Sequence, residues 1–354
     1  MEKKHIVTVV GARPQFIKAA IVSQALSMAP NLRETLIHTG QHYDSNMSAD
    51  FFDQLKLPNP IMLKGATGSS EEVVGNMANR LNVWLHNHKS SNQVDMILCY
   101  GDTNSTLAAA MVAKHNGIAL AHVEAGLRSF NVHQIEEMNR QLTDKMSDLL
   151  FPPTQDAQRN IQDENLRGKA VLCGDVMYDL MLKFKKTLPT HKSVCSKFGL
   201  KNAPYYLITL HRGETLNDPA KIKYILDYVR NLAQGTQVLF PIHPHTQKVV
   251  AANSISLNGY QVIPPIGYGD MQACLQSCKG VFTDSGGLQK EAYYHRKPVV
   301  ILRRETEWTE LVDSAWAKFL DNAKDMQFSP TFDPNYGNGK SGEKIIGALE
   351  DYLN

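Results

Sequence analysis

The chain has 354 residues, of which 43% are hydrophobic, and its 37 basic and 35 acidic residues give a net charge of +2. That length accommodates two ordinary domains with substantial cores, and the balanced charge argues against a protein that binds nucleic acid or a membrane surface. No stretch approaches the length of a membrane-spanning helix, no signal peptide is evident and the five cysteines form no Cys-x-x-Cys pair, so we expect a cytoplasmic protein without disulfides or a metal.

Short apolar runs alternate with longer helical patterns, which is typical of a parallel sheet with helical crossovers. In the first half we expect strands at residues 6–10, 35–38, 96–100, 118–123 and 149–151. In the second half the expected strands are 206–210, 238–241, 261–263, 280–282 and 298–302.

This alternation predicts an α/β protein with two Rossmann-like, doubly wound domains that face a central cleft. We place the first domain at residues 1–174 and the second, which would bind a nucleotide, at residues 175–339. A C-terminal helix over about 340–354 is expected to pack back on the first domain. The Lys-, Thr-, Ser- and Pro-containing stretch at 183–200 is the expected linker region.

The first strand is followed by Gly11-Ala12-Arg13-Pro14 and then Lys18. Ligands of open parallel sheets bind beyond the carboxyl ends of the strands, so this segment should face a ligand. Cations at the N-terminus of a helix oppose its dipole and favour an anion there. Arg13 and Lys18 are therefore candidate contacts for a diphosphate or sugar, the alternative being solvated charges.

Acidic residues follow two later strands of the first half. Asp102 comes after the third strand, and Glu124, Arg128 and Glu136 come after the fourth. Carboxylates that converge are costly unless they are paired or have raised pKa values, which is how enzymes prepare groups for proton transfer. Asp102 has a simpler alternative role as the cap of the next helix.

Two segments of the second half could contact a phosphorylated ligand. His211, flanked by Arg212 and Glu214 at a strand end, is a candidate acid, base or phosphate contact. The stretch 283–287, Thr-Asp-Ser-Gly-Gly, ends a strand and opens a helix whose free N–H groups would favour phosphate. Glu291, one turn further on, could accept the hydroxyls of a ribose. Alternatively, this Gly-Gly turn is a packing device.

These motifs, in this order, are similar to those of the non-hydrolysing UDP-N-acetylglucosamine 2-epimerases, a family with the two-domain GT-B architecture. The resemblance spans nearly the whole chain. It is carried by residues 11–14 with Lys18 and by the segments 38–43, 101–103, 122–128, 136–140, 211–212 and 283–292.

The resemblance implies an isomerase that interconverts UDP-N-acetylglucosamine and UDP-N-acetylmannosamine for surface polysaccharide precursors. UDP would leave to give 2-acetamidoglucal and then add again, without a cofactor or metal. The implied catalytic residues are Asp102, Glu124, Glu136 and His211, and the assignment of base and acid among them stays open. The implied substrate-binding residues are Arg13, Lys18, Arg128, Tyr268, Met271, Ser285, Gly286, Gly287, Glu291 and Trp308.

The resemblance further implies a homodimer and a second site at which UDP-N-acetylglucosamine activates the enzyme. Gln41, His42 and Arg212 match that second site in part.

The chain departs from the family pattern at three places. Gln15 stands where Arg-Pro is usually followed by Glu, Ile135 stands where Pro precedes the Glu pair, and Trp308 replaces an arginine expected near the substrate. With the segment 267–271, Trp308 resembles the branch that epimerises UDP-2,3-diacetamido-2,3-dideoxyglucuronate. That sugar is therefore an alternative substrate. A hydrolysing epimerase, a GT-B glycosyltransferase and a sugar-nucleotide sensor are further alternatives.

Overall fold

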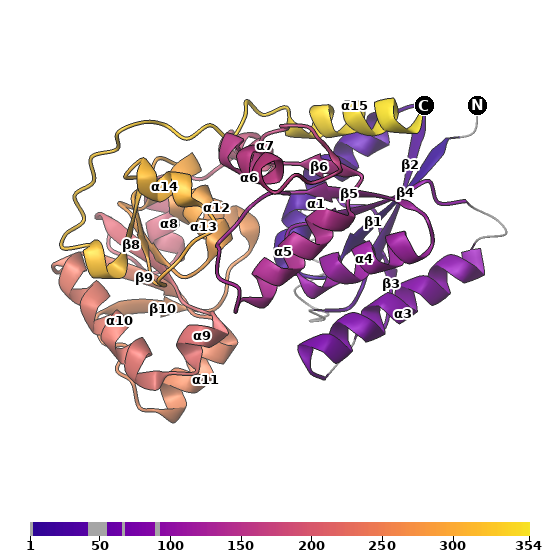
Figure 1. The fold of residues 1–354 in the computed structure, drawn as a ribbon. Coiled ribbons are helices and arrows are strands. Elements are labelled where there is room, and N and C mark those ends of the chain that lie inside the picture. The colour runs from indigo at the N-terminus through magenta and orange to yellow at the C-terminus, as the bar shows by residue number, and fades with distance from the viewer. Residues whose placement is uncertain (1–2, 42–54, 66–67, 89–92) are drawn as a thin grey trace. The chain divides into compact units, whose positions relative to one another are not determined.

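The computed structural model describes residues 3–41, 55–65, 68–88 and 93–354. The chain divides into two compact units, which we describe separately. Unit 1 comprises Met1–Leu180 and Asn335–Asn354, and unit 2 comprises Met181–Pro334 (Figure 1). The first division falls inside helix α7 (Val176–Lys185), and the second falls between Pro334 and Asn335, outside the helices and strands.

Unit 1 contains a parallel sheet whose strands follow the order β3-β2-β1-β4-β5-β6-β7. The chain builds outward from β1 to one edge, returns, and builds from β4 to the other edge. The loops after β1 and β4 therefore diverge, and this topological switch point is where doubly wound sheets bind ligands. The strands are β1 (Lys4–Val10), β2 (Leu32–His38), β3 (Ile61–Met62), β4 (Met96–Tyr100), β5 (Ala119–Val123), β6 (Leu149–Phe151) and β7 (Lys169–Ala170).

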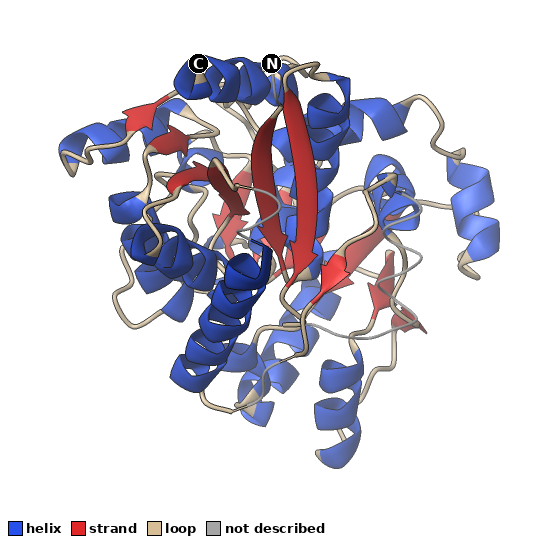
Figure 2. Ribbon diagram, turned by 90° about the vertical axis from the view of Figure 1, so that its right-hand side faces the viewer, coloured by secondary structure: helices blue, strands red, loops and turns tan. Residues whose placement is uncertain are grey.

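Helices cover both faces of the strands (Figure 2). Besides α7, the described helices of unit 1 are α1 (Arg13–Met28), α3 (Ser70–His88), α4 (Asn104–His115), α5 (Ile135–Met146), α6 (Gln155–Asp163) and α15 (Ser341–Leu353).

Helix α15 belongs to unit 1 although the chain reaches it only after unit 2. It packs so closely on α1 that a Cβ atom on Gly342 would lie 2.8 Å from Ile21 Cγ2. The carboxylate of Asp179 accepts hydrogen bonds from Ser341 Oγ at 3.0 Å and from the Gly342 N–H at 3.1 Å. The second bond satisfies a backbone N–H of the first turn that the helix itself cannot pair.

Unit 2 contains a second parallel sheet with the order β10-β9-β8-β11-β12-β13, and its switch point lies between β8 and β11. The predicted fold class, two doubly wound parallel-sheet domains, is confirmed. The strands are β8 (Tyr205–Thr209), β9 (Gln237–Pro241), β10 (Tyr260–Ile263), β11 (Val281–Thr283), β12 (Val299–Ile301) and β13 (Ala317–Phe319). The helices are α8 (His191–Lys197), α9 (Gly213–Leu216), α10 (Pro219–Ala233), α11 (Pro244–Ala252), α12 (Tyr268–Ser277), α13 (Gly286–Tyr294), α14 (Thr309–Asp313) and the 3-10 turn η1 (Leu320–Asn322).

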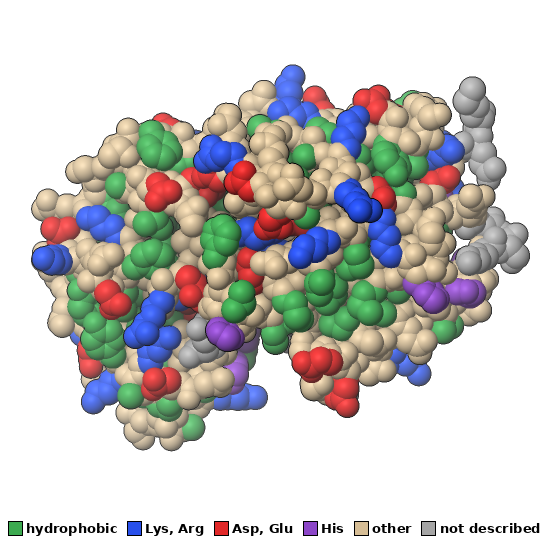
Figure 3. All heavy atoms as spheres, viewed as in Figure 1, with side chains coloured by type: hydrophobic (Ala, Val, Ile, Leu, Met, Phe, Trp, Pro, Cys, Tyr) green, Lys and Arg blue, Asp and Glu red, His purple; other side chains and the backbone are tan. Residues whose placement is uncertain are grey.

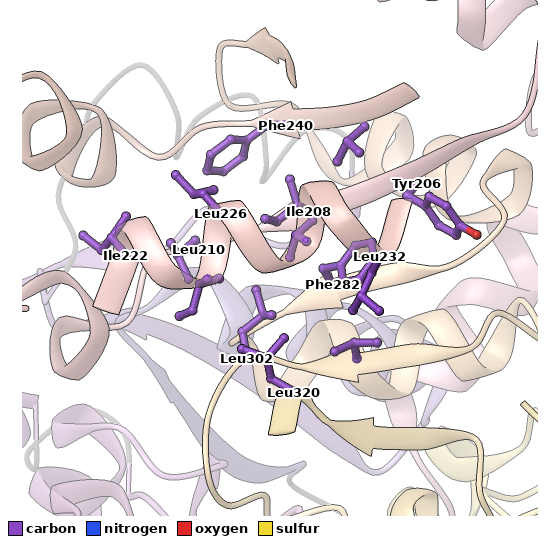
Figure 4. Close-up of a cluster of buried hydrophobic side chains, with 14 of the residues drawn as sticks. Tyr206, Ile208, Leu210, Ile222, Leu226, Leu232, Phe240, Phe282, Leu302 and Leu320 are labelled. Atoms are coloured by element: carbon purple, nitrogen blue, oxygen red, sulfur yellow. The ribbon is translucent and has the colours of Figure 1, made fainter. Parts of the chain in front are cut away.

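The core of unit 2 supports the strand ends at its switch point. Ile222 and Leu226 lie four residues apart on one face of α10 and join a buried cluster with Ile208, Phe240 and Phe282 from three neighbouring strands (Figure 4). The Asp218 side chain caps α10 by accepting the Lys221 N–H at 3.1 Å.

Figure 3 shows basic and acidic side chains interspersed on the face drawn, in keeping with the small net charge. Among the helices that the structure describes, none combines the length and apolar character needed to cross a membrane.

Candidate active site

Lys18, Gly101 and Glu124 come together at the switch point of unit 1, although they follow three different strands. The Lys18 ammonium donates to Glu124 Oε1, and each of the two side chains is only 8% exposed. A Cβ atom on Gly101 would lie 2.8 Å from Lys18 Nζ and 3.4 Å from Glu124 Oε1, so glycine leaves room for this pair. A buried ion pair is weak evidence for stability, because desolvation opposes it, and it points instead to a use for the two charges.

Glu124 also has a strained backbone. Its φ angle of 73° lies in the left-handed region that residues with a Cβ rarely adopt. Hydrogen bonds hold the surrounding turn, since the Glu124 N–H donates to Phe151 O at 3.1 Å and the Gly126 N–H donates to Asp144 Oδ2 at 3.0 Å. Strain that the surroundings impose in this way is common at active sites.

His122 and Asp144 are fully buried and connect the Gly101 and Glu124 turns. His122 Nδ1 lies 2.7 Å from Asp144 Oδ1, and His122 Nε2 lies 2.7 Å from the carbonyl oxygen of Gly101. Burial would raise the pKa of Asp144, but the contacts with His122 and Arg128 hold it below the ordinary value. An ionised Asp144 and a carbonyl oxygen can only accept, so both ring nitrogens of His122 face acceptors, and the ring bridges the two turns.

Asp102 is anchored by α5. Its Oδ2 atom accepts from Arg140 Nη2 at 2.8 Å and from Arg140 Nε at 3.1 Å, while Asn139 Nδ2 donates to its carbonyl oxygen at 2.9 Å. The side chain is 26% exposed. Thr103, rather than Asp102, is the N-cap residue of α4, so the structure does not place Asp102 in the capping role. The carboxylate is held in position by a cation and still reaches solvent.

The neighbouring acids Glu136 and Glu137 in the first turn of α5 have different environments. Glu137 is buried, and its Oε2 atom accepts from Arg140 Nη1 at 2.5 Å and from the Ser129 N–H at 2.8 Å. Burial opposes ionisation, but these contacts keep the pKa of Glu137 below its ordinary value. Glu137 therefore fixes the start of α5, and the half-buried Glu136 is the acid with access to solvent.

Arg13 and Arg128 also differ in burial and in the partners of their side chains. Arg13 is half-buried at the first position of α1. Arg128 is buried, and its guanidinium donates to Asp144 Oδ2 at 2.7 Å and to both carboxylate oxygens of Glu164 at 2.6 and 2.9 Å. Its bonds are made to the protein, so we interpret Arg128 as a residue that positions the turn after Glu124.

The second nucleotide site was expected to involve Gln41, His42 and Arg212, and the structure describes two of these residues, each in a different unit. Gln41 Oε1 accepts from the backbone N–H of Ser105 at 3.1 Å and from its hydroxyl at 2.6 Å. Arg212 belongs to unit 2, and His42 lies outside the described residues.

At the switch point of unit 2, Asp284 organises His211. Asp284 Oδ2 accepts the N–H groups of His211 and Arg212, both at 2.8 Å, and Asp284 Oδ1 lies 3.2 Å from His211 Nδ1. Burial would raise the pKa of Asp284, but the His211 side chain and the two N–H groups hold it below the ordinary value. Since the His211 ring is 42% exposed, a carboxylate orients an accessible imidazole, as in many general acid–base sites.

The expected phosphate cradle follows β11. Ser285 caps α13 by accepting the Leu288 N–H at 3.4 Å, and Gly286 and Gly287 form the first turn of the helix. A Cβ atom on Gly286 would lie 1.8 Å from Glu307 Oε1, so any larger residue here would have to displace the Glu307 carboxylate. The helix dipole and the N–H groups of this turn favour an anion.

Glu291, the expected ribose contact, is held by a relay of hydrogen bonds. Gln272 Nε2 donates to Glu291 Oε1 at 3.0 Å, and Gln272 Oε1 lies 2.9 Å from His295 Nε2. Burial, with Lys185 and Lys297 nearby, lowers the pKa of His295 to about 4. The ring is therefore neutral at pH 7, and its Nε2–H orients Gln272 and through it Glu291.

Tyr268, Met271 and Trp308 are placed in or beside helices of unit 2. Tyr268 is buried and Met271 half-buried in the first turn of α12. Trp308 is buried as the N-cap residue of α14, and Lys290 Nζ lies 4.3 Å from the centre of a Trp308 ring. That distance is within the range of a cation–π interaction.

Four residues that position the candidate groups were not predicted from the sequence: Arg140, Asp144, Gln272 and Asp284. A signal existed for two of them. Arg140 ends the segment 136–140, and Asp284 stands in the strand-end stretch 283–287. Asp144 and Gln272 lie inside helices, where their sequence neighbours do not indicate a buried partner.

The family model described as UDP-N-acetylglucosamine 2-epimerase matches residues 24–350. The chain belongs to the UDP-N-acetylglucosamine 2-epimerase family. This confirms the resemblance, and because the related proteins are UDP-sugar 2-epimerases, the predicted isomerase class is confirmed as well.

Relatives in the family support the assignment along the whole chain. A UDP-2,3-diacetamido-2,3-dideoxy-D-glucuronate 2-epimerase of Pseudomonas aeruginosa is 41% identical over 325 residues, which cover 91% of this chain and 89% of the relative. A solved structure of the Methanocaldococcus jannaschii UDP-GlcNAc 2-epimerase with UDP-GlcNAc and UDP has a TM-score of 0.86 and 32% identity, covering 99% of this chain and 100% of the other. The Neisseria meningitidis enzyme bound to UDP-GlcNAc has a TM-score of 0.86 and 26% identity, covering 98% of this chain and 100% of the other.

Proposed function

We propose that this epimerase inverts C2 of a UDP-2-acetamido sugar by eliminating and re-adding UDP. A base removes the proton at C2, the C–H electron pair forms the C1–C2 double bond, and UDP leaves from C1 with the electrons of the C1–O bond. UDP then attacks C1 again while an acid protonates C2 from the opposite face. Atoms and electrons balance without an external oxidant.

The observation that carries the proposal is the group of Lys18, Asp102 and Glu124 at the switch point of unit 1. Glu124 combines burial, an ion pair and a strained backbone. Asp102 is a carboxylate aligned by Arg140 and partly open to solvent. Proton transfer at carbon needs positioned acids and bases of this kind, whereas a binding protein does not.

We assign the nucleotide to unit 2. Ser285, Gly286 and Gly287 would contact the diphosphate and Glu291 the ribose, while His211, aligned by Asp284, would stabilise charge on the departing UDP. We assign Asp102, Glu124 and Glu136 in unit 1 to the two proton transfers.

For the sugar, we place UDP-2,3-diacetamido-2,3-dideoxyglucuronate first. The support is the 41% identity to the Pseudomonas aeruginosa enzyme with that name, together with Trp308 at a position where the resemblance leads us to expect arginine. UDP-N-acetylglucosamine, our first expectation from the sequence, is the second candidate, supported by the structural match to an enzyme bound to that sugar. Either product would supply glycosyltransferases that build a polysaccharide.

Proton NMR of the wild-type enzyme with each sugar in heavy water tests the proposal. We expect the substrate to exchange its C2 proton for deuterium and its C2 epimer to accumulate, with no net release of UDP. Glu124→Gln and Asp102→Asn should each lower kcat by about 100-fold or more while the protein stays folded, because a positioned base or acid contributes that much.

The outcomes separate the alternatives. Release of one UDP per turnover would identify a hydrolysing epimerase, and turnover only with an added acceptor would identify a glycosyltransferase. If the C2 proton of both sugars stays unexchanged, the proposed reaction is wrong.

We also propose the homodimer and the activation by UDP-N-acetylglucosamine that the resemblance implies. Sedimentation equilibrium tests the first, since a mass of one chain would contradict it. Initial rates with added UDP-N-acetylglucosamine test the second. A candidate dimer face is the group of exposed apolar side chains Met111, Phe130, Val132, Ile135, Met138 and Leu142 on or next to α4 and α5.

A further inference from the structure

Arg303 and Gln289 offer buried donors beside the first turn of α13. Arg303 is 6% exposed and Gln289 is fully buried. In the part of the chain that the structure describes, no acceptor reaches Arg303 Nε, Arg303 Nη1 or Gln289 Nε2. Leaving a buried donor unpaired is costly, and more so for a charged group, which points to a partner for these N–H groups.

The contacts that are present orient both side chains without using these donors. Arg303 Nη2 donates to Glu307 Oε2 and lies 3.5 Å from Thr306 Oγ1. The Thr306 hydroxyl in turn donates to Gln289 Oε1 at 2.6 Å. These contacts fix Nη2 of Arg303 and the amide oxygen of Gln289. The N–H groups on Arg303 Nε and Nη1 and on Gln289 Nε2 are left for another partner.

That partner would lie next to the phosphate cradle. Arg303 Nη2 is 3.3 Å from the place where a Cβ atom of Gly286 would stand, at the first position of α13. The helix N-terminus adds its own N–H groups and positive dipole end to the arginine charge. The guanidinium has two edges with paired N–H groups, Nε with Nη2 and Nη1 with Nη2. Glu307 accepts from Nη2, which has a second N–H, so an oxyanion could take the paired N–H groups of the other edge.

We propose that Arg303 and Gln289 form a binding site for an anionic oxygen pair of the substrate, either on the diphosphate of UDP or on the sugar carboxylate of UDP-2,3-diacetamido-2,3-dideoxyglucuronate. The inference rests on the proposed function and adds two residues to its binding machinery. Arginine recognises phosphate and carboxylate through the same paired geometry, so the structure defines the chemistry and the probes decide the source.

Calorimetric titration of the wild type and of Arg303→Lys with UDP, UDP-N-acetylglucosamine and UDP-2,3-diacetamido-2,3-dideoxyglucuronate tests the site. Lysine keeps the charge but loses the fork, so we expect Kd to rise about 10- to 100-fold. A rise for all three ligands identifies the diphosphate as the partner, and a rise for the uronate alone identifies its carboxylate. Arg304→Lys, on the exposed neighbour, is the matched control and should leave every Kd unchanged.

Because Arg303→Lys alters a buried ion pair, a measurement on the wild type accompanies it. The Arg303 Nε–H resonance, assigned by its loss in the variant, should shift when UDP or the uronate binds. Unchanged Kd values for all three ligands in a folded variant, or an Nε–H resonance that none of them moves, would overturn the inference. If either of these results is found while the wild type still exchanges the C2 proton, the proposed function stands and only the Arg303 site is wrong. If the wild type binds none of the three ligands, the proposed function and the Arg303 site are both wrong.

Discussion

Gln15 shows how one amide can join two loops of a site. Its Oε1 atom accepts the N–H groups of Gly11 and Ala12 at 2.8 and 3.1 Å, and its Nε2 atom donates to Tyr100 O and to Thr106 Oγ1, both at 3.0 Å. All four hydrogen-bonding positions of the amide are used. The loop after β1, which leads to Lys18, is thereby tied to the end of β4, which leads to Asp102.

Gln15→Glu should therefore destabilise the protein, although glutamate is the residue we expected at this place. An ionised carboxylate has no N–H groups and would face the Tyr100 carbonyl oxygen inside the protein. We expect the free energy of unfolding to fall by about 2–4 kcal/mol in a denaturant titration. Gln155→Glu, on the exposed first residue of α6, is the control and should be neutral or slightly stabilising.

His122→Gln tests whether the buried imidazole ring positions the Gly101 and Glu124 turns. Glutamine carries both of its N–H donors on one nitrogen, so it cannot reach Asp144 and the Gly101 carbonyl oxygen as the two separate ring nitrogens do, and the turns should shift. We expect kcat to fall at least about tenfold while KM for the UDP-sugar changes little, because misplacement affects the chemical step more than nucleotide binding. An equal loss from His115→Gln, on the surface of α4, or a change in KM alone, would argue against this role.

Asp144 and Asp284 should make stability fall in acid. In the folded protein the pKa values of both carboxyls lie below the ordinary value, since contacts with histidine and N–H donors outweigh burial. Such groups stabilise the fold above the unfolded pKa of about 3.9, and the contribution is lost as pH falls toward their folded pKa values. We expect Asp144→Asn to be less stable than the wild type at pH 7 and the difference to shrink as pH falls below about 4, as thermal unfolding would measure.

At the scale of elements, the sequence predicted the strands that carry the site and missed three short strands at the edges of the sheets. The predicted strands 96–100 and 149–151 match β4 and β6 to the residue. β3, β7 and β13 were not predicted, and each is an edge strand or a strand of only two or three residues. Two or three residues are too few to show an alternation of apolar and polar side chains. An edge strand also lacks a neighbouring strand on one side, so its residues need not form a continuous apolar run.

The residues of the candidate site that follow strand ends could be predicted, because their types and their places after apolar runs can be seen in the sequence. The residues that hydrogen-bond to them could not be predicted, because those contacts depend on how the helices pack. Arg140 meets Asp102 only because α5 lies against α4 in unit 1. The same holds for Gln272, which reaches Glu291 from α12.

Gly286→Ala tests the close approach at the start of α13. The added methyl group would collide with Glu307 Oε1, and its displacement would move Arg303 as well. We expect UDP binding to weaken at least about tenfold and the melting temperature to fall. The control is Gly347→Ala in α15, where no atom lies within 4 Å of the added Cβ and the change should stabilise the helix by up to about 1 kcal/mol.

At the scale of the whole molecule, α15 should contribute to unit 1 and leave unit 2 unchanged. Leu349 is fully buried on α15, so Leu349→Ala should lower the free energy of unfolding by about 2–5 kcal/mol. Amide hydrogen exchange should then become faster in α1 and in the unit 1 strands that α1 contacts, but stay unchanged in β8 and β11 of unit 2. The control is Asp351→Ala, on the exposed face of the same helix.

The place of α15 has a consequence for synthesis of the protein on the ribosome. Unit 2 is translated in one continuous stretch, so all of its segments are available before α15 is made. Unit 1, although begun first, must wait for its last helix, and until then the apolar face of α1 that α15 covers has no permanent cover. Nascent chains should therefore acquire a protease-resistant unit 2 before a protease-resistant unit 1, the reverse of their order along the chain.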